Sequence, residues 1–259
     1  MDNQFNQFNG GMAQPAAVPF DEGLRLYLVR VFNWMAAGLA LTGLTSWAVI
    51  HTSLAGAFFK LVMTQGGLFP VGLTGLGWVA VLAPLAFVLV LSFGLNRLSR
   101  QAVQGLFLLF SVVMGVSMAS LVMCYTGVSV ARTFFVCAAL YAAVAFWGYT
   151  TKRSLASMGS FLFMGMIGLL IAMVVNLIWP SGMMSMVISC VGVVLFTAFT
   201  AYDMQSIKIG YQEMSAVLPP DELGKRSVYD ALSLYLDFIN LFQFLLSLMG
   251  QNSSSSNNN

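Results

Sequence analysis

The chain has 259 residues, of which 59% are hydrophobic and only 8% are charged, and its formal net charge is +2. Because soluble domains carry roughly 25% Asp, Glu, Lys and Arg, this composition predicts an integral membrane protein within a lipid bilayer. The few positive charges are dispersed along the chain, whereas a nucleic-acid surface needs clustered Lys and Arg. Polynucleotide partners are therefore excluded.

The first element in the chain is a polar segment rich in Asn, Gln, Gly and Pro, and the last is a Ser/Asn tail. Neither contains enough apolar surface to fold. We expect residues 1–24 to form a mobile polar segment and residues 250–259 to form a disordered tail. A single transmembrane domain is then expected over residues 25–249.

Within this domain, seven apolar runs are long enough to cross a hydrocarbon core of about 30 Å, which takes about 20 residues as a helix. The runs lie near residues 29–50, 71–95, 103–123, 133–149, 159–179, 183–204 and 228–249. They are continuous, whereas barrel strands need short alternating runs of about 10 residues. The sequence therefore predicts an all-α integral membrane protein with seven transmembrane helices.

The distribution of basic residues predicts the orientation of the chain. Nine of the eleven Lys and Arg residues fall on one side of the predicted spans, and only Lys60 and Arg132 fall on the other. Since loops rich in these residues stay in the cytoplasm, we expect a cytoplasmic N-terminus and, after seven crossings, a C-terminus on the opposite side. Retention and transit signals are not recognisable, which favours a bacterial inner membrane.

The last span contains a carboxylate, Asp237, in the run SLYLDFINLF. It would lie about 13 Å below the cytoplasmic boundary, too deep for its short side chain to reach water. One face of this helix carries the polar residues Asp230, Ser233, Asp237, Asn240, Gln243 and Ser247. Because a polar face needs protein or water beside it, the seventh helix is expected to be interior. An intramembrane carboxylate costs at least about 2.5 kcal/mol and typically marks an ion or proton route, with packing specificity as the alternative.

A second carboxylate, Asp203, ends the sixth span in FTAFTAYDMQSIK. Thr197, Thr200 and Asp203 step along one side of that helix and form a polar strip. The alternative interpretation of Asp203 is a solvated residue at the edge of a span, because charges are common there.

Two of these segments resemble a known family. AYDMQSIK at the end of the sixth span and LSLYLDFINLF in the seventh are similar to the most characteristic segments of the Bax inhibitor-1 family, the transmembrane BAX inhibitor motif proteins. The resemblance extends over residues 25–249, and the chain is identified as a bacterial member. Many relatives have Thr where this chain has Met204, which leaves Asp203 in register.

The resemblance implies a bundle in which six helices surround the seventh, and a leak that conducts calcium into the cytosol. It also implies that Asp203 and Asp237 form a hydrogen-bonded pair near the cytoplasmic end of the pore, whose protonation is coupled to opening. Family members have an Arg at the cytoplasmic end of the second span that pairs with this dyad. Arg97 in FGLNRLSR is the best match, Arg100 is the competing candidate, and an ordinary positive-inside anchor is the alternative role.

The chemistry of two close carboxylates agrees with such a gate. Both cannot easily ionise in a low-dielectric site, so one proton is shared and the pair titrates as a unit. Calcium prefers carboxylate and carbonyl oxygens, which the stripe from Asp230 to Asn240 also offers. Two or three oxygens are too few for the roughly 6 to 8 ligands of a tight site, so Asp203 and Asp237 are expected to bind permeating calcium transiently. No resident cofactor is expected.

Other functional classes agree less well with the sequence. The single histidine, His51, is far from both acidic segments, and no phosphate loop or GxSxG segment is present, so an enzyme is not expected. Intramembrane aspartyl proteases also use two carboxylates, but their Gly-Xaa-Gly-Asp segment is missing here. The remaining alternative is a non-conducting protein that modulates a membrane protease or a stress or cell-death pathway. The cytoplasmic loop 205–227 would then be the docking surface.

Overall fold

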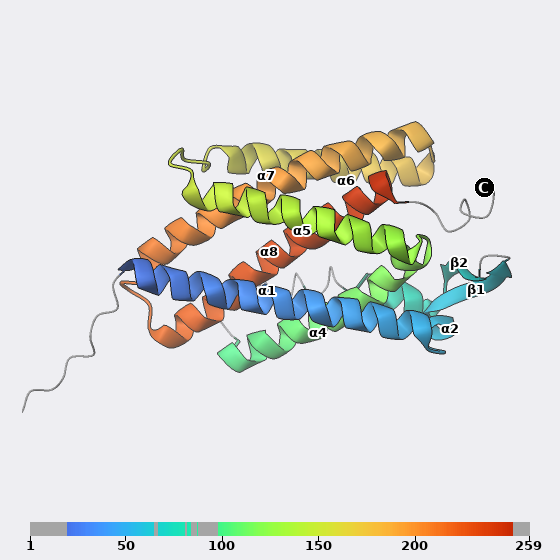
Figure 1. The fold of residues 1–259 in the computed structure, drawn as a ribbon, viewed down its shortest axis with the longest axis horizontal. Coiled ribbons are helices and arrows are strands. Elements are labelled where there is room, and N and C mark those ends of the chain that lie inside the picture. Colours follow the sequence, from blue (N-terminus) through green and yellow to red (C-terminus); the bar gives the residue numbers. More distant parts are fainter. Residues whose placement is uncertain (1–19, 65–66, 81, 84–86, 88–97, 251–259) are drawn as a thin grey trace, which may run out of the picture.

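The computed structural model describes residues 20–64, 67–80, 82–83, 87 and 98–250. Figure 1 shows these residues as long helices with a small β-hairpin at one end. The helices are α1 (Phe20–His51), α2 (Ala55–Phe58), α4 (Arg100–Met123), α5 (Gly127–Thr150), α6 (Met158–Ile178), α7 (Gly182–Met214) and α8 (Pro220–Met249). The strands are β1 (Phe59–Thr64) and β2 (Gly67–Leu73), and residues 75–80 are also helical. Our predictions for residues 1–19 and 251–259 lie outside the described residues.

Six of the described helices, namely α1 and α4 to α8, are long and apolar enough to cross a membrane. This confirms an all-α membrane protein. The predicted second span, near residues 71–95, lies mostly outside the described ranges. However, α1 ends beside the hairpin and α4 begins at the opposite end of the bundle (Figure 1). The chain must therefore return between His51 and Arg100, and a seventh transmembrane helix stays a prediction.

The β-hairpin that follows α1 was not expected. β1 and β2 are antiparallel, with Phe59 opposite Leu73. Phe59 is fully buried and packs with Val49 of α1 and Ala119 of α4, so the hairpin covers the ends of these two helices. The FKLVMT segment of β1 contains the aromatic and β-branched residues that favour strands, a local signal that a search for long apolar runs does not detect. β2 ends at Leu73, so residues 71–73 belong to this strand and not to the start of the predicted second span.

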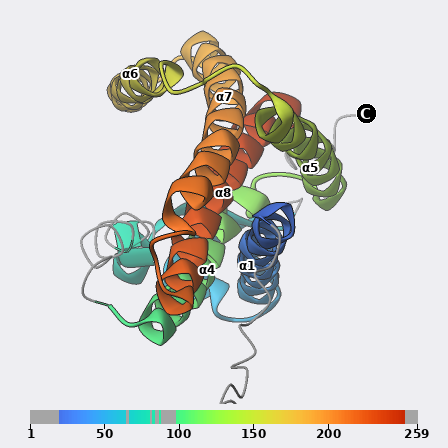
Figure 2. The same cartoon turned by 90° about the vertical axis from the view of Figure 1, so that its left-hand side faces the viewer.

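The last helix, α8, is central. Of its apolar span, 56% is buried, compared with 11% to 33% for the other five helices. It packs against α1, α4, α5 and α7, which confirms the prediction of an interior last helix. The predicted ring of six helices is not what the described residues show, because α6 lies outside and packs on α7 (Figure 2). α6 has no charged residue and buries only Leu162 and Leu169, so lipid is a suitable environment for its other faces.

The start of α1 corrects our boundary for the polar N-terminal segment. α1 begins at Phe20, so residues 20–24 are helical rather than part of a mobile segment. Leu24 and Tyr27 are buried, and Tyr27 packs against Tyr211 of α7 with ring centroids 4.8 Å apart. Tertiary contacts with the end of α7 therefore extend the helix beyond its apolar run.

The predicted docking loop, residues 205–227, is also mostly helical. α7 continues to Met214 and α8 begins at Pro220, which leaves only a short turn between them. A Pro in the first helical turn, followed by two acidic residues, favours a helix start at this point. Lys225 and Ser227 are buried, so the segment is not the exposed loop that we expected.

Candidate functional site

The site is centred on Asp237, within α8. Its side chain is buried, with 6% of the residue exposed. The Oδ2 atom has no hydrogen-bond partner among the described residues. Buried polar atoms are almost always paired, and a lone buried carboxylate oxygen is costly, so this atom needs an explanation beyond packing.

Asp203 approaches the same region from α7. It is half-buried, and its charge and the charge of Asp237 affect each other. No hydrogen bond between described residues joins the two carboxylates, so the pair implied by the family resemblance is an electrostatic pair in this structure. Tyr141 of α5 lies within electrostatic reach of both aspartates and donates its hydroxyl to the Leu234 carbonyl at 3.0 Å. Helices α5, α7 and α8 thus meet at the site.

Asp230 has very different surroundings from Asp237. The Tyr27 hydroxyl donates to its Oδ2 at 2.6 Å, and Arg226 Nε donates to its Oδ1 at 2.9 Å. We predicted Asp230 as part of the ion route, but both of its oxygens are engaged here. Sequence reasoning missed both partners, although the spacing of Arg226 and Asp230 by four residues on one helix is a recognisable signal.

The two arginine candidates for the dyad are not equally placed. Arg97 lies outside the described residues. Arg100 Nη1 is 3.4 Å from Asp221 Oδ1 at the exposed start of α8, so it contacts neither Asp203 nor Asp237. The described part of the chain contains no Lys or Arg within ion-pair distance of either member of the dyad.

Three further polar residues of α8, namely Asn240, Gln243 and Ser247, make hydrogen bonds within α8, to α4 and to α7, respectively. Asn240 donates to the Leu236 carbonyl of its own helix at 2.8 Å. Gln243 Nε2 lies 2.9 Å from Met118 Sδ on α4, and Ser247 accepts from Ser189 of α7 at 3.0 Å. Across the described residues, no three His, Cys, Asp or Glu side chains are grouped closely enough to hold a metal ion.

Sequence comparisons match almost the whole described bundle. A family model described as inhibitor of apoptosis-promoting Bax1 covers residues 24–254. The chain belongs to the Bax inhibitor-1 family. Asp203, Asp237 and the helices that carry them all lie within the matched region.

Relatives of this Bax inhibitor-1 protein include several bacterial proteins. An uncharacterized protein of Rickettsia prowazekii is 40% identical over 89% of this chain and 92% of its own. An uncharacterized protein of Caulobacter vibrioides is 37% identical over 95% of this chain and 99% of its own. The inner membrane protein YbhL of Escherichia coli is 37% identical over 88% of this chain and 92% of its own.

The family segment AYDMQSIK also has a structural role that the sequence did not reveal. Gln205, two residues after Asp203, is buried and holds the turn between α5 and α6. Its Oε1 accepts from the Leu155 amide at 2.6 Å, and its Nε2 donates to the Arg153 carbonyl at 2.8 Å. The side chain therefore holds the part of α7 that carries Asp203 against this turn.

Proposed function

We propose that this Bax inhibitor-1 protein is a pH-sensitive calcium leak, gated by Asp203 and Asp237 near the cytoplasmic end of the pore. The observation that supports it most directly is the buried Oδ2 of Asp237, which lacks a hydrogen-bond donor among the described residues. A buried carboxylate oxygen at membrane depth that no described residue engages is available to a proton or a cation. Arg97 is the proposed cationic partner of the pair.

The oxygen chemistry along α8 favours calcium as the permeant ion. Ser233 and Asn240 lie on the same side of α8 as Asp237 and, at 100° per residue, on the side opposite Phe238. Their oxygens and those of the dyad are hard ligands of the kind that calcium prefers. Too few oxygens are present for tight binding, so an ion would bind briefly and move on.

A shared proton would make this gate sensitive to pH. Because the charges of Asp203 and Asp237 affect each other, the two groups titrate together rather than independently. Protonation changes the number of ionised oxygens in the pathway, and with it the attraction for a divalent cation. Calcium flux is therefore expected to vary with pH.

Calcium flux into proteoliposomes, measured across pH, tests this function. The wild type should show a flux that depends on pH, and Asp203→Asn combined with Asp237→Asn should lose that dependence. Asp221→Asn is the matched control, because Asp221 is exposed at the start of α8 and pairs with Arg100. A double variant with wild-type pH dependence would remove the dyad from the gate, and no protein-dependent flux at any pH would reject the leak.

α6 favours a second candidate function, an interaction protein that modulates a membrane protease or another membrane protein. It is the least buried of the spanning helices, and Phe161, Met164 and Ile171 are exposed on it. A partner helix can pack on such a surface as lipid does. A photo-crosslinker at Met164 in native membranes should then capture one discrete protein, whereas one at Phe146, exposed on α5, should not. Lipid adducts alone at Met164 would reject this function.

We further propose a bacterial inner membrane as the location, with the N-terminus in the cytoplasm. The proposal is supported by the relative YbhL, an inner membrane protein, and by the uneven distribution of Lys and Arg.

A further inference from the structure

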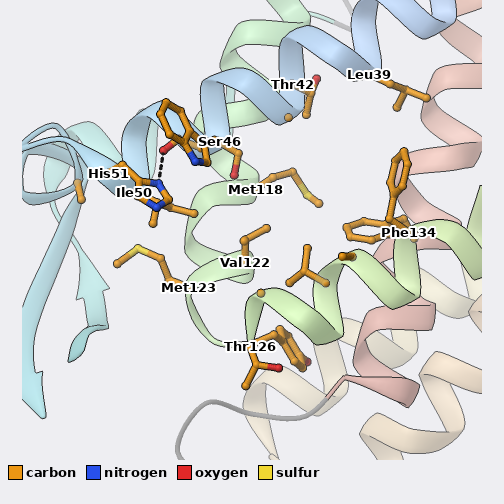
Figure 3. Close-up of a pocket in the computed structure, with 18 of the residues that line it drawn as sticks. Leu39, Thr42, Ser46, Ile50, His51, Met118, Val122, Met123, Thr126 and Phe134 are labelled. Atoms are coloured by element: carbon orange, nitrogen blue, oxygen red, sulfur yellow. Dashed lines mark hydrogen bonds between the residues drawn. The ribbon is translucent and has the colours of Figure 1, made fainter. Parts of the chain in front are cut away.

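A large cavity lies away from the carboxylates, in the half of the bundle that contains the hairpin. Its volume is about 1070 Å³, and its walls come from α1, α2, α4, α5 and α8. Figure 3 shows mostly apolar side chains around it, including Met118, Val122 and Phe134. Pockets that hold small molecules typically measure about 300–1,000 Å³, so this cavity is large enough for a sizeable apolar group.

The cavity adjoins a seam between α1 and α5. α1 packs mainly on α4 and α8, and α5 packs mainly on α7 and α8, so the seam is not closed by packing of α1 on α5. Trp47 of α1 and Phe135 of α5 both line the cavity and are 61% and 72% exposed. Because both helices belong to the membrane-spanning set, the surroundings of this seam are lipid.

Ser46 supplies a polar atom inside this apolar space. It lines the cavity, is 6% exposed, and its Oγ has no hydrogen-bond partner among the described residues. Hydroxyl groups in helices commonly donate to a carbonyl one turn earlier, as Thr45 does to Leu41 and Thr52 does to Ala48. Ser46 does not, and it points toward the cavity from α1 (Figure 3). A ligand acceptor beside Ser46 would satisfy this hydroxyl.

The depth of Ser46 matches the chemistry of a bilayer lipid. The rim of the cavity is polar, with His51 at the end of α1, Thr52 and Ser53 directly after it, and Thr126 before α5. Ser46 lies five residues before His51, which is about 7.5 Å along the helix. The headgroup region on each side of a bilayer is about 5–7 Å thick, so a lipid with its headgroup at this rim has its ester carbonyls near Ser46.

We propose that the cavity holds one acyl chain of a phospholipid from the surrounding bilayer, which enters between α1 and α5. Its ester carbonyl accepts a hydrogen bond from Ser46 Oγ, and its chain extends toward Met118 and Phe238. Phe238 faces the cavity on the side of α8 opposite Ser233 and Asn240. The lipid site is therefore separate from the proposed ion route and does not depend on it.

Two glycines provide a matched pair of variants. Gly43 lines the cavity, and a Cβ atom at this position would meet no atom within 4 Å. The Cβ of Gly43→Leu therefore has open space around it, and its side chain adds bulk at the wall of the cavity where the acyl chain would lie. Gly168 on α6 also has no atom within 4 Å of a Cβ and is not part of the cavity, so Gly168→Leu is the control.

The test uses vesicles of phosphatidylglycerol and phosphatidylethanolamine that contain a phosphatidylethanolamine with a diazirine on one acyl chain. Labelling is mapped by peptide mass spectrometry at Met118, which is 4% exposed, and at Met164, which is 71% exposed on α6. We expect label at both positions in the wild type and in Gly168→Leu. In Gly43→Leu, Met118 should lose its label while Met164 keeps it. Ser46→Ala should weaken Met118 labelling by roughly fivefold, the loss expected for one hydrogen bond.

Labelling at Met164 reports contact with bulk lipid in every sample. A missing label at Met118 can therefore not be explained by a failure of the labelling reaction. Wild-type protein that is labelled at Met164 but not at Met118 would show that no acyl chain occupies the cavity. Equal labelling of Met118 in the wild type and Gly43→Leu would show that the chain reaches Met118 by another path. Either result would overturn the proposal.

Discussion

Asp230 and Asp237 lie on the same side of α8, yet their carboxylates have opposite surroundings. Asp230 accepts from Tyr27 on α1 and from Arg226 on its own helix. Asp237 Oδ2 accepts from no described residue. Asp230 therefore joins α1 to the central helix, whereas Asp237 has a buried oxygen that no described residue engages.

The Tyr27–Asp230 contact gives a prediction about stability. Tyr27→Phe removes the hydroxyl that lies 2.6 Å from Asp230 Oδ2 and leaves a buried carboxylate oxygen without that donor. We expect a loss of about 1–3 kcal/mol in the free energy of unfolding, measured by denaturant titration in detergent. Tyr149→Phe is the control, because the ring and carbonyl of Tyr149, not its hydroxyl, contact Lys208. Equal stability of the two variants would show that the Tyr27 hydroxyl contributes little.

Gln205 gives a second prediction at this scale. Gln205→Ala removes both hydrogen bonds to the turn between α5 and α6 and leaves the Leu155 amide and the Arg153 carbonyl without this partner. We expect a cost of about 1–3 kcal/mol, seen as a lower midpoint of thermal unfolding. Gln101→Ala, at an exposed position of α4, should change the midpoint little. An unchanged midpoint in Gln205→Ala would mean that water replaces the side chain.

Helix packing beside the dyad depends on a glycine in α5. A Cβ atom at Gly148 would lie 2.5 Å from the Ala201 carbonyl oxygen and 2.9 Å from Ala201 Cα, on the α7 turn just before Asp203. Neither of these backbone atoms can move away as a flexible side chain can. Gly148 thus sets the distance between two of the three helices that meet at the site.

Gly148→Ala is therefore expected to destabilise the bundle, although Ala favours a helix by about 1 kcal/mol over Gly. Overpacking at this contact should cost about 1–3 kcal/mol and separate α5 from α7. Gly168→Ala, at a position with open space, should be neutral or stabilising. Unfolding of the two variants under the same detergent conditions distinguishes these effects. A Gly148→Ala variant as stable as Gly168→Ala would show that α7 adjusts without cost.

Elements of this fold differ in how far the sequence determined them. Continuous apolar runs located six spanning helices, because lipid requires long apolar segments. The extensions of α7 and α8 beyond their apolar runs were missed, because packing between distant segments rather than hydropathy holds them. The interior position of Asp237 followed from one helix, whereas the contact of Tyr27 with Asp230 joins residues 203 positions apart, which no local pattern reveals.

On the scale of the whole molecule, the central helix separates two environments. The apolar cavity and the seam between α1 and α5 lie on the Phe238 side of α8. Ser233 and Asn240 occupy the opposite side, and Asp237 lies between the two sides, 100° around the helix from Phe238. The proposed ion route and the proposed lipid site can therefore coexist in one bundle, because the oxygens of Ser233 and Asn240 and the cavity wall at Phe238 face opposite ways.

The ends of the bundle also predict which segments share a side of the membrane. The ends of α1 and α8 lie at the hairpin end of the bundle, and the turn between α7 and α8 lies at the opposite end (Figure 1). Thr52 follows α1, Met249 ends α8, and Val217 is in the turn. Single cysteines at these three positions, with the native cysteines replaced by Ala, are to be labelled with a membrane-impermeant maleimide. In intact bacterial cells with a permeabilised outer membrane, we expect labelling of Thr52→Cys and Met249→Cys only.

Val217→Cys should react only after the inner membrane is opened, because the turn that contains it belongs to the end rich in Lys and Arg. Val217 is 80% exposed, so burial would not explain its protection in intact cells. Labelling of Val217→Cys alone would reverse the orientation. If only one of Thr52→Cys and Met249→Cys is labelled in intact cells, the ends of α1 and α8 do not lie on the same side of the membrane. That result would also contradict the return crossing between His51 and Arg100, on which a seven-span chain depends.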